Sequence, residues 1–177
     1  RIILLAIVSL QAASYKILVY NPKFGYSHSN FLGNIADILV DAGHDVTSFI
    51  PILDPEAKDG TVKSKKVYVP QSEKSKKLIH SVKVEKADYF SWSNFDLIRT
   101  LQMPRTFDRQ LILQCEAVLE DTEILQKFQD EKFDVMIVEN FEMCGVAYSH
   151  LVRPKSLITT SASSPFSFMY EEFGIPL

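Results

Sequence analysis

Residues 15–50 constrain the fold most, because they read as a strand, a helix and a second strand in direct succession. Residues 15–20 are short, apolar and β-prone, as expected of a buried parallel strand. An amphipathic helix is predicted after the break at Asn21-Pro22, and it ends at Gly43, a residue suited to the conformation that terminates helices. Residues 45–50 then form a second strand. This strand–helix–strand unit predicts an α/β fold with a right-handed crossover.

The rest of the chain continues this alternation. We predict further strands at residues 66–69, 133–138 and 156–160, and a short helix at 144–151. Residues 94–131 have a helical pattern that we expect to be interrupted near Pro104. The apolar stripes expected to face the core are Phe31, Ile35, Ile38, Leu39 and Ala42 in the first helix, and Phe107, Leu111, Cys115, Val118 and Leu119 later. The pattern predicts one Rossmann-like parallel sheet with flanking helices.

Composition excludes several classes of protein. The 177 residues suffice for one domain with a substantial core, and 46% hydrophobic against 23% charged residues is typical of a globular chain. A net charge of −3 argues against a nucleic-acid partner, whose phosphates require a basic face. No apolar run approaches the roughly 20 residues of a membrane-spanning helix.

The N-terminal segment, residues 1–14, has the pattern of a secretory signal peptide. A positive flank at Arg1 precedes an apolar run and then the small residues 12–14, with a cleavage site expected before Tyr15. The alternative is a first buried strand, although residues 16–20 already supply one. We expect the mature domain to occupy residues 15–177.

Two cysteines, Cys115 and Cys144, are too few for a disulfide scaffold. They could pair in a secretory compartment, but sequence does not give their separation. Buried free thiols are the state that we predict.

Three polar segments follow predicted strands and should gather at one edge of the sheet: residues 21–28, 139–142 and 161–165. Ligands of open α/β sheets bind beyond the carboxyl ends of the strands. His28 lies in the first segment, and Glu139 directly follows the strand at 133–138. The topology therefore allows a histidine–carboxylate pair, in which the carboxylate orients a general base. A capping or solvent-exposed histidine is the alternative interpretation.

Other familiar chemistries lack their motifs. The sequence contains no G-x-S-x-G nucleophile elbow, no G-x-x-x-x-G-K-[ST] phosphate loop and no C-x-x-C pair. The first loop has only Gly25, so a dinucleotide fingerprint is also missing. His80 and His150 have no partners at metal-ligand spacing, so we predict neither a metal site nor a bound cofactor.

Taken together, these motifs resemble the UDP-glycosyltransferase family, and among its branches the animal, invertebrate-like UDP-glucuronosyltransferases. The resemblance rests on Ser27-His28-Ser29, on residues 39–47 (Leu-Val-Asp-Ala-Gly-His-Asp-Val-Thr) and on Phe133-Asp134-Val135. Cys115, Cys144 and residues 173–176 fall in family order and spacing. The resemblance implies the N-terminal, acceptor-binding domain of a two-domain GT-B enzyme, here incomplete.

The resemblance also implies roles for individual residues. His28 falls on the family's catalytic base, and Glu139 stands where the family has an aspartate, which lengthens the side chain by one methylene. The implied reaction transfers a sugar from a UDP-sugar, UDP-glucuronate or UDP-glucose, to a hydroxyl of a small lipophilic acceptor, with inversion and without a metal. Five aromatic side chains are predicted to line the acceptor pocket: Phe24, Tyr26, Phe141, Phe166 and Phe168.

The family pattern implies that the donor binds mainly to a C-terminal domain, and that a C-terminal anchor attaches the enzyme to the membrane of the endoplasmic reticulum. Neither the donor signature nor the anchor occurs within the 177 residues. The chain alone is therefore predicted to be inactive, as a fragment of a longer enzyme that could form homo- or hetero-oligomers. The alternatives are a non-catalytic module that binds small molecules or regulates a partner, and an unrelated flavodoxin-like domain.

Overall fold

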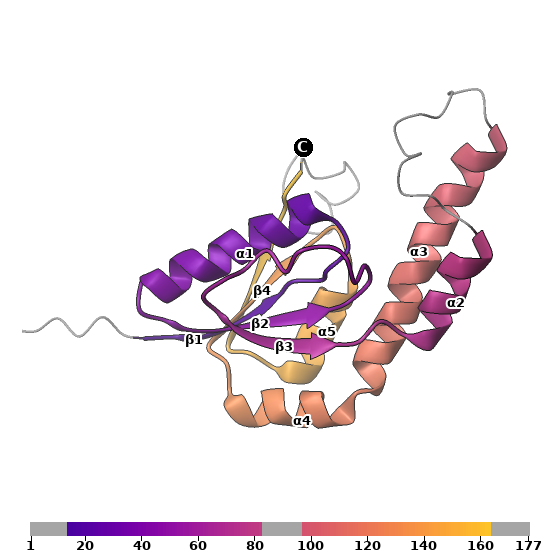
Figure 1. Cartoon of the computed structure of the whole chain (residues 1–177). Coiled ribbons are helices and arrows are strands. Elements are labelled where there is room, and N and C mark those ends of the chain that lie inside the picture. Colours follow the sequence, from indigo (N-terminus) through magenta and orange to yellow (C-terminus); the bar gives the residue numbers. More distant parts are fainter. Residues whose placement is uncertain (1–13, 83–96, 164–177) are drawn as a thin grey trace, which may run out of the picture.

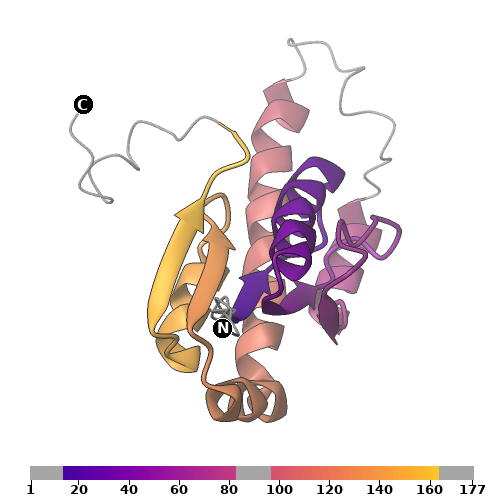
Figure 2. The same cartoon turned by 90° about the vertical axis from the view of Figure 1, so that its left-hand side faces the viewer.

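The structure, a computed structural model, describes residues 14–82 and 97–163. Its centre is a five-stranded parallel sheet with the order β3-β2-β1-β4-β5. The strands are β1 (Lys16–Tyr20), β2 (Asp45–Pro51), β3 (Lys65–Val69), β4 (Val135–Glu139) and β5 (Ser156–Thr160). Figure 2 shows β5 at the edge of the sheet, beside β4. The predicted fold class is confirmed.

Helices cover both faces of the sheet (Figure 1). Helix α1 (Tyr26–Asp41) lies on one face, whereas α4 (Thr122–Glu131) and α5 (Cys144–Val152) lie on the other. Helix α3 (Leu97–Glu120) also contributes to the second face and packs against α2 (Glu73–Val82). Within the described parts of the chain, no helix combines the length and apolar character needed to cross a membrane.

Alternating side chains of β1 build two separate cores. Ile17 and Val19 point toward α1 and pack with Leu32 and Ala36. Leu18 and Tyr20 point to the opposite face, where α3, α4 and α5 supply Val118, Phe128 and Tyr148, among others. Because successive side chains of a strand face opposite sides, a central strand covered on both faces is apolar throughout. This explains the uninterrupted apolar run that marked β1 in the sequence.

Helix α1 buries a stripe of smaller residues than the sequence predicted. Ser29, Leu32, Gly33 and Ala36 are its buried residues, whereas Ile38 is 66% exposed. Ala42, also predicted to face the core, is exposed as the C-cap residue. The helix approaches its neighbours so closely that small residues fit best, and Phe31, Ile35 and Leu39 pack at the margin of that contact.

The close approach is made by the loop between β2 and β3, which crosses α1. A Cβ atom on Gly33 would lie 2.1 Å from the backbone of Gly60, and one on Gly60 would lie 1.9 Å from the Ser29 carbonyl oxygen. Gly60 also has a positive φ of 79°, which other residues rarely adopt. The Asp37 carboxylate accepts hydrogen bonds from the Thr61 hydroxyl and from two backbone N–H groups of the loop. The loop thereby fixes the position of α1.

Helix α3 differs from the prediction in two respects. It runs without a break through residue 104, and the interruption lies instead at Asp121, whose side chain accepts a hydrogen bond from the Ile124 N–H at 3.0 Å and caps α4. A proline removes one helical hydrogen bond but does not have to end a helix. Leu119, expected in the core, is 39% exposed, whereas Leu113 and Gln114 are buried.

Candidate active site

The sheet topology places His28 and Glu139 side by side. The chain leaves β1 toward β2 on one side, and β4 pairs with the other side of β1, so the connections diverge at the β1–β4 boundary. Such a switch point leaves a crevice beyond the carboxyl ends of the two strands. His28 lies in the first turn of α1, just after β1, and Glu139 is the last residue of β4. Two residues 111 positions apart thereby meet.

A hydrogen bond joins the two side chains. His28 Nδ1 lies 2.7 Å from Glu139 Oε1 and 2.9 Å from Oε2, so the longer glutamate reaches the ring. The Glu139 side chain is 3% exposed and also accepts a hydrogen bond of 3.0 Å from the Ala162 N–H. A carboxylate can only accept, so the proton of the neutral imidazole resides on Nδ1. The lone pair of Nε2 is then available to a ligand, and the His28 side chain is 18% exposed.

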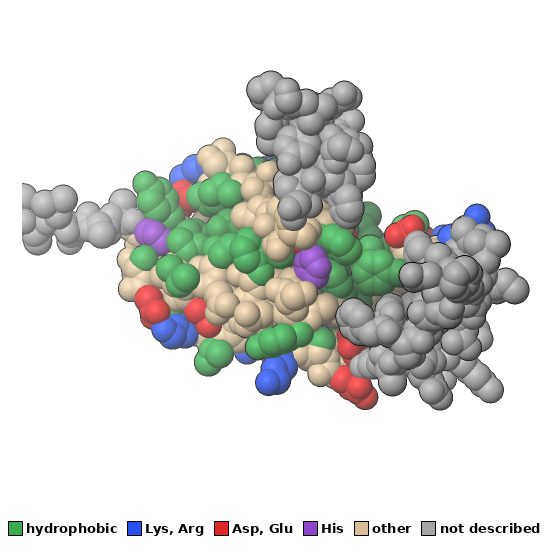
Figure 3. All heavy atoms as spheres, turned by 90° about the horizontal axis from the view of Figure 1, so that it is seen from above, with side chains coloured by type: hydrophobic (Ala, Val, Ile, Leu, Met, Phe, Trp, Pro, Cys, Tyr) green, Lys and Arg blue, Asp and Glu red, His purple; other side chains and the backbone are tan. Residues whose placement is uncertain are grey.

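Aromatic rings surround the histidine. The Phe141 ring centroid lies 4.6 Å from that of His28, and the Phe24 centroid lies 5.0 Å from it. Phe24 and Phe141 stack with an interplanar angle of 16°. Phe107 of α3 completes the cluster at 5.9 Å from Phe24 and 6.2 Å from Phe141. Viewed from above α1, Figure 3 shows hydrophobic side chains on this face with histidine among them. The three phenylalanines, here called the aromatic cluster, are each partly exposed.

The predicted pocket residues are only partly brought together. Phe24 and Phe141 lie beside His28, whereas Tyr26 is 55% exposed and its ring is contacted by the Lys58 ammonium, 5.7 Å from the centroid. No ring contact among the described residues joins Tyr26 to the aromatic cluster. Phe166, Phe168 and residues 1–13 of the predicted signal peptide lie outside the described residues. Phe107 was predicted only as a core residue, because its helical spacing matches that of core positions.

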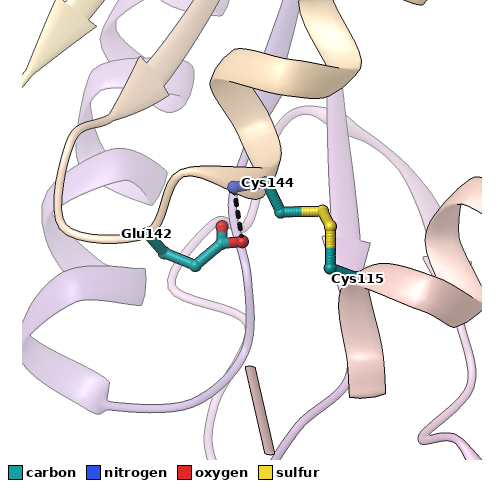
Figure 4. Close-up of side chains that lie close together, drawn as sticks. All are labelled: Cys115, Glu142 and Cys144. Atoms are coloured by element: carbon teal, nitrogen blue, oxygen red, sulfur yellow. Dashed lines mark hydrogen bonds between the residues drawn. A yellow bond between two sulfur atoms is a disulfide. The ribbon is translucent and has the colours of Figure 1, made fainter. Parts of the chain in front are cut away.

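The prediction of free thiols is wrong, because Cys115 and Cys144 form a disulfide. Their separation of 29 residues hides the fact that α3 and α5 pack on the same face of the sheet. Figure 4 shows that this bond joins α3 to the first residue of α5. The covalent link lies only five residues from Glu139 in sequence and therefore borders the candidate active site.

Glu142 is buried beside the disulfide (Figure 4). Its Oε1 accepts a hydrogen bond of 2.8 Å from the Cys144 N–H, at the N-terminus of α5, while Oε2 has no hydrogen-bond partner within residues 14–82 and 97–163. Burial raises the pKa of Glu142 to about 7, against the opposing effect of the N–H groups of Cys144 and Gly145 and of the Tyr20 hydroxyl. A carboxyl oxygen and both sulfur atoms lie within 4.8 Å of one another, but the disulfide occupies both sulfurs.

The family model for UDP-glucoronosyl and UDP-glucosyl transferase matches residues 15–173. The chain belongs to this family. The match spans all the elements that carry His28, Glu139 and the disulfide. Family membership and the resemblance stated from the motifs therefore agree.

Individual members of the UDP-glycosyltransferase family show how much of such a protein the chain represents. It is 31% identical to ugt-47 and 29% identical to ugt-48, both named as UDP-glucuronosyltransferases of Caenorhabditis elegans, and each alignment covers 99% of this chain. Human UDP-glucuronosyltransferase 3A2 is 28% identical over 95% of the chain. The chain spans about one third of the length of these relatives: 34% of ugt-48, 33% of ugt-47 and 31% of the human protein.

Solved structures of glycosyltransferases share the fold. The calicheamicin glycosyltransferase CalG4 superimposes with a TM-score of 0.50 at 14% identity, covering 93% of this chain and 38% of that protein. Glycosyltransferase SsfS6 of Streptomyces sp. SF2575, in its complex with thymidine diphosphate, gives 0.50 at 15% identity, covering 83% and 38%. The sheet and its helices thus match part of a GT-B glycosyltransferase.

Proposed function

We propose that this chain is the acceptor-binding part of a glycosyltransferase that moves a sugar from a UDP-sugar to a hydroxyl of a small lipophilic acceptor. The observation that carries the proposal is the hydrogen bond between His28 and Glu139 at the switch point of the sheet. Membership of the UDP-glycosyltransferase family supports the reaction class. The thymidine diphosphate bound to SsfS6 supports a nucleoside-diphosphate sugar as donor.

In this proposal His28 is the general base. Glu139 accepts a hydrogen bond from the Nδ1–H group of His28, which leaves Nε2 free to take the proton of the acceptor hydroxyl. The carboxylate then stabilises the imidazolium that forms. The acceptor oxygen attacks the anomeric carbon as its bond to the UDP oxygen breaks. A single displacement of this kind inverts the configuration at that carbon. It requires no covalent glycosyl–enzyme intermediate, because the acceptor is itself the nucleophile.

The aromatic cluster supports a lipophilic acceptor. Phe24, Phe107 and Phe141 present partly exposed rings next to the histidine, and such rings bind apolar surfaces while leaving one polar group to be recognised. The hydroxyl would be directed toward His28 Nε2. We extend the proposed acceptor contacts to Tyr26, Phe166 and Phe168 on the basis of the sequence alone.

The disulfide supports a proposed location in the secretory pathway, since disulfides persist in oxidising compartments. An endoplasmic reticulum enzyme attached through a C-terminal anchor accords with this proposal. The test is immunofluorescence of the full-length protein against a reticulum marker after expression in a eukaryotic cell. A cytosolic distribution would contradict it.

The reaction is tested by replacing the base in the full-length protein. We expect His28→Ala to lower turnover by about 10²–10⁴-fold, the usual contribution of a positioned general base. The dissociation constant for UDP should stay unchanged. Transfer to a panel of phenols and alcohols, followed by mass spectrometry of the product, provides the measurement. Turnover within twofold of the unaltered protein would exclude His28 as the base, while acceptor binding without any transfer would favour a non-catalytic binding module.

A further inference from the structure

The disulfide at the N-terminus of α5 has the surroundings of a reactive bond rather than an inert cross-link. Cys144 is the first residue of α5 and only 6% exposed, whereas Cys115 of α3 is partly exposed. An incoming thiolate therefore reaches the sulfur of Cys115 more easily than that of Cys144. Attack there makes Cys144 the leaving group. A helix N-terminus stabilises the thiolate that leaves, which favours this direction of cleavage.

Glu142 supplies what the leaving sulfur requires next. Its carboxyl is buried, one of its oxygens lies within 4.8 Å of both sulfur atoms, and Oε2 has no hydrogen-bond partner among the described residues. Such a separation can be closed by rotation of the released cysteine or by one water molecule. An acid that stays protonated near neutral pH can donate to a new thiolate, and burial raises the pKa of Glu142 to about 7.

Among the described residues, the groups that act on the pKa of Glu142 are backbone N–H groups and a phenol rather than a cation. Tyr20 of β1 lies on one side, and it approaches closely because Gly145 has no side chain: a Cβ there would lie 2.7 Å from the Tyr20 ring. Burial, followed by the nearby Glu142, raises the pKa of Tyr20 well above its usual value, so the phenol stays neutral. From α3, the sulfur of Cys115 lies within 4.8 Å of a Glu142 carboxyl oxygen.

We propose that Cys115–Cys144 is an exchangeable disulfide, a redox modification site at which a dithiol attacks Cys115, Cys144 leaves, and Glu142 protonates the released sulfur. In the first step a thiolate of the dithiol bonds to Cys115 Sγ, and the electron pair of the broken S–S bond goes to Cys144 Sγ. In the second step the other thiol of the reagent attacks the mixed disulfide and releases Cys115. Glu142 regains its proton from solvent, so overall two electrons and two protons pass to the protein, and the reagent becomes a cyclic disulfide.

The disulfide lies close in sequence to residues of the candidate active site, so its reduction should affect that site. Residues 139–144 run from the His28 partner through Phe141 to the cross-linked cysteine, and α3 carries both Phe107 and Cys115. Reduction removes the covalent tie between α3, which holds Phe107, and α5, which directly follows the segment that holds Phe141. The modification site would thus act as a redox control on acceptor binding, a consequence that rests on the proposed function.

The test measures reduction of the folded, full-length protein by dithiothreitol between pH 5.5 and 9. Alkylation at set times, followed by mass spectrometry of the two cysteine peptides, gives the rate constant, which is divided by the concentration of reagent thiolate. We expect this normalised rate to fall about tenfold as pH rises through about 7, because Glu142 loses its proton. A flat profile in the unaltered protein would overturn the proposal, even if every variant failed to fold.

Two variants assign the proton donor. Glu142→Gln should give a flat profile, about tenfold below the unaltered protein at pH 6 and meeting it at high pH. Glu116→Gln is the matched control, because Glu116 neighbours Cys115 but pairs with Lys74 at 3.2 Å. It should keep the profile of the unaltered protein. Equal profiles for Glu142→Gln and the unaltered protein, or a rate that merely follows global unfolding in urea, would refute the assignment.

The link to acceptor binding has a separate readout. Reduced and alkylated full-length enzyme should show a raised KM for the acceptor, and reoxidation of unalkylated enzyme with oxidised glutathione should restore it. Since the exchange rate is measured by mass spectrometry, it is independent of any transferase activity. An unchanged KM after reduction would sink the redox control of the site, whereas absence of any transfer would count against the proposed function.

Discussion

Two glutamates three residues apart, Glu139 and Glu142, share a residue type and nearly the same burial but have opposite surroundings. They are 4% and 7% exposed. Glu139 faces α1, where both of its oxygens lie within hydrogen-bond distance of His28. Glu142 faces α3 and α5, where one oxygen accepts a hydrogen bond from the Cys144 N–H and the other has no partner in the part of the chain that the structure describes. Residues 139–142 thus present one carboxyl to each side of the sheet.

The contrasting surroundings of Glu139 and Glu142 show that burial alone does not determine what a carboxyl can do. A buried carboxylate that accepts hydrogen bonds on both oxygens can orient the group that donates them. A buried carboxyl with an unpartnered oxygen is stabilised in its neutral form and becomes a proton donor. Local partners, supplied by α1 in one case and by α5 and the disulfide in the other, distinguish the two roles that we propose.

The largest expected difference between the two glutamates appears when each is replaced by glutamine. An amide at position 139 can donate to His28 Nδ1 and so place the imidazole proton on Nε2, the wrong nitrogen for a base. We expect Glu139→Gln to lower turnover of the full-length enzyme about a thousandfold, with UDP affinity unchanged. With the disulfide intact, Glu142→Gln should change turnover less than about twofold at pH 8. Similar losses in the two variants would show that both residues act only by holding the same segment.

The pH dependence of stability reports the burial of Glu142 with a smaller effect. The pKa of Glu142 rises from 4.5 to about 7 on burial, so the folded protein keeps a proton that the unfolded chain has already released in this range. Stability therefore falls as pH rises from 4.5 toward 7, and about 3 kcal/mol is lost once Glu142 is ionised in both states. Glu142→Gln remains neutral and escapes this loss.

Urea unfolding of the oxidised protein at pH 5 and pH 8 measures the effect. The free energy of unfolding of Glu142→Gln, relative to the unaltered protein, should increase by about 2–3 kcal/mol between the two pH values. Glu123→Gln, at an exposed position in the first turn of α4, provides the control and should show no such change. A difference that is the same at both pH values would contradict the neutral state of buried Glu142.

The sequence predicted the fold well because its signals are local. The apolar run at β1, the helix ended by Gly43 and the return as β2 each arise from neighbouring residues, and the parallel pairing of β1 with β2 follows from them. Contacts between distant segments were harder to foresee. The buried stripe of α1 was misplaced because the loop that covers it, with Gly60 against Gly33, lies far along the chain.

The same distinction applies to the site. The contact between His28 and Glu139 could be predicted from the strand ends, since parallel strands bring their carboxyl ends to one edge of the sheet. The disulfide was missed because no local pattern marks the contact between α3 and α5. Glu142 was predicted only as part of the polar segment 139–142. Its place two residues before a helix is a signal for capping, but its burial beside Tyr20 and the cysteines depends on tertiary packing.

Helix α3 connects the two regions, since it carries Phe107 of the aromatic cluster and Cys115 of the disulfide. Phe107→Ala removes a ring 5.9 Å from Phe24 and 6.2 Å from Phe141 without touching the hydrogen bond of His28. A lost aromatic contact costs about 1 kcal/mol, which predicts a rise of about five- to tenfold in the acceptor KM with turnover nearly unchanged. Ile112→Ala, at a position of α3 that is 49% exposed, should leave both constants unaltered. If turnover fell while KM stayed constant, Phe107 would act by orienting His28. Helix α3 would then contribute to catalysis rather than to acceptor binding.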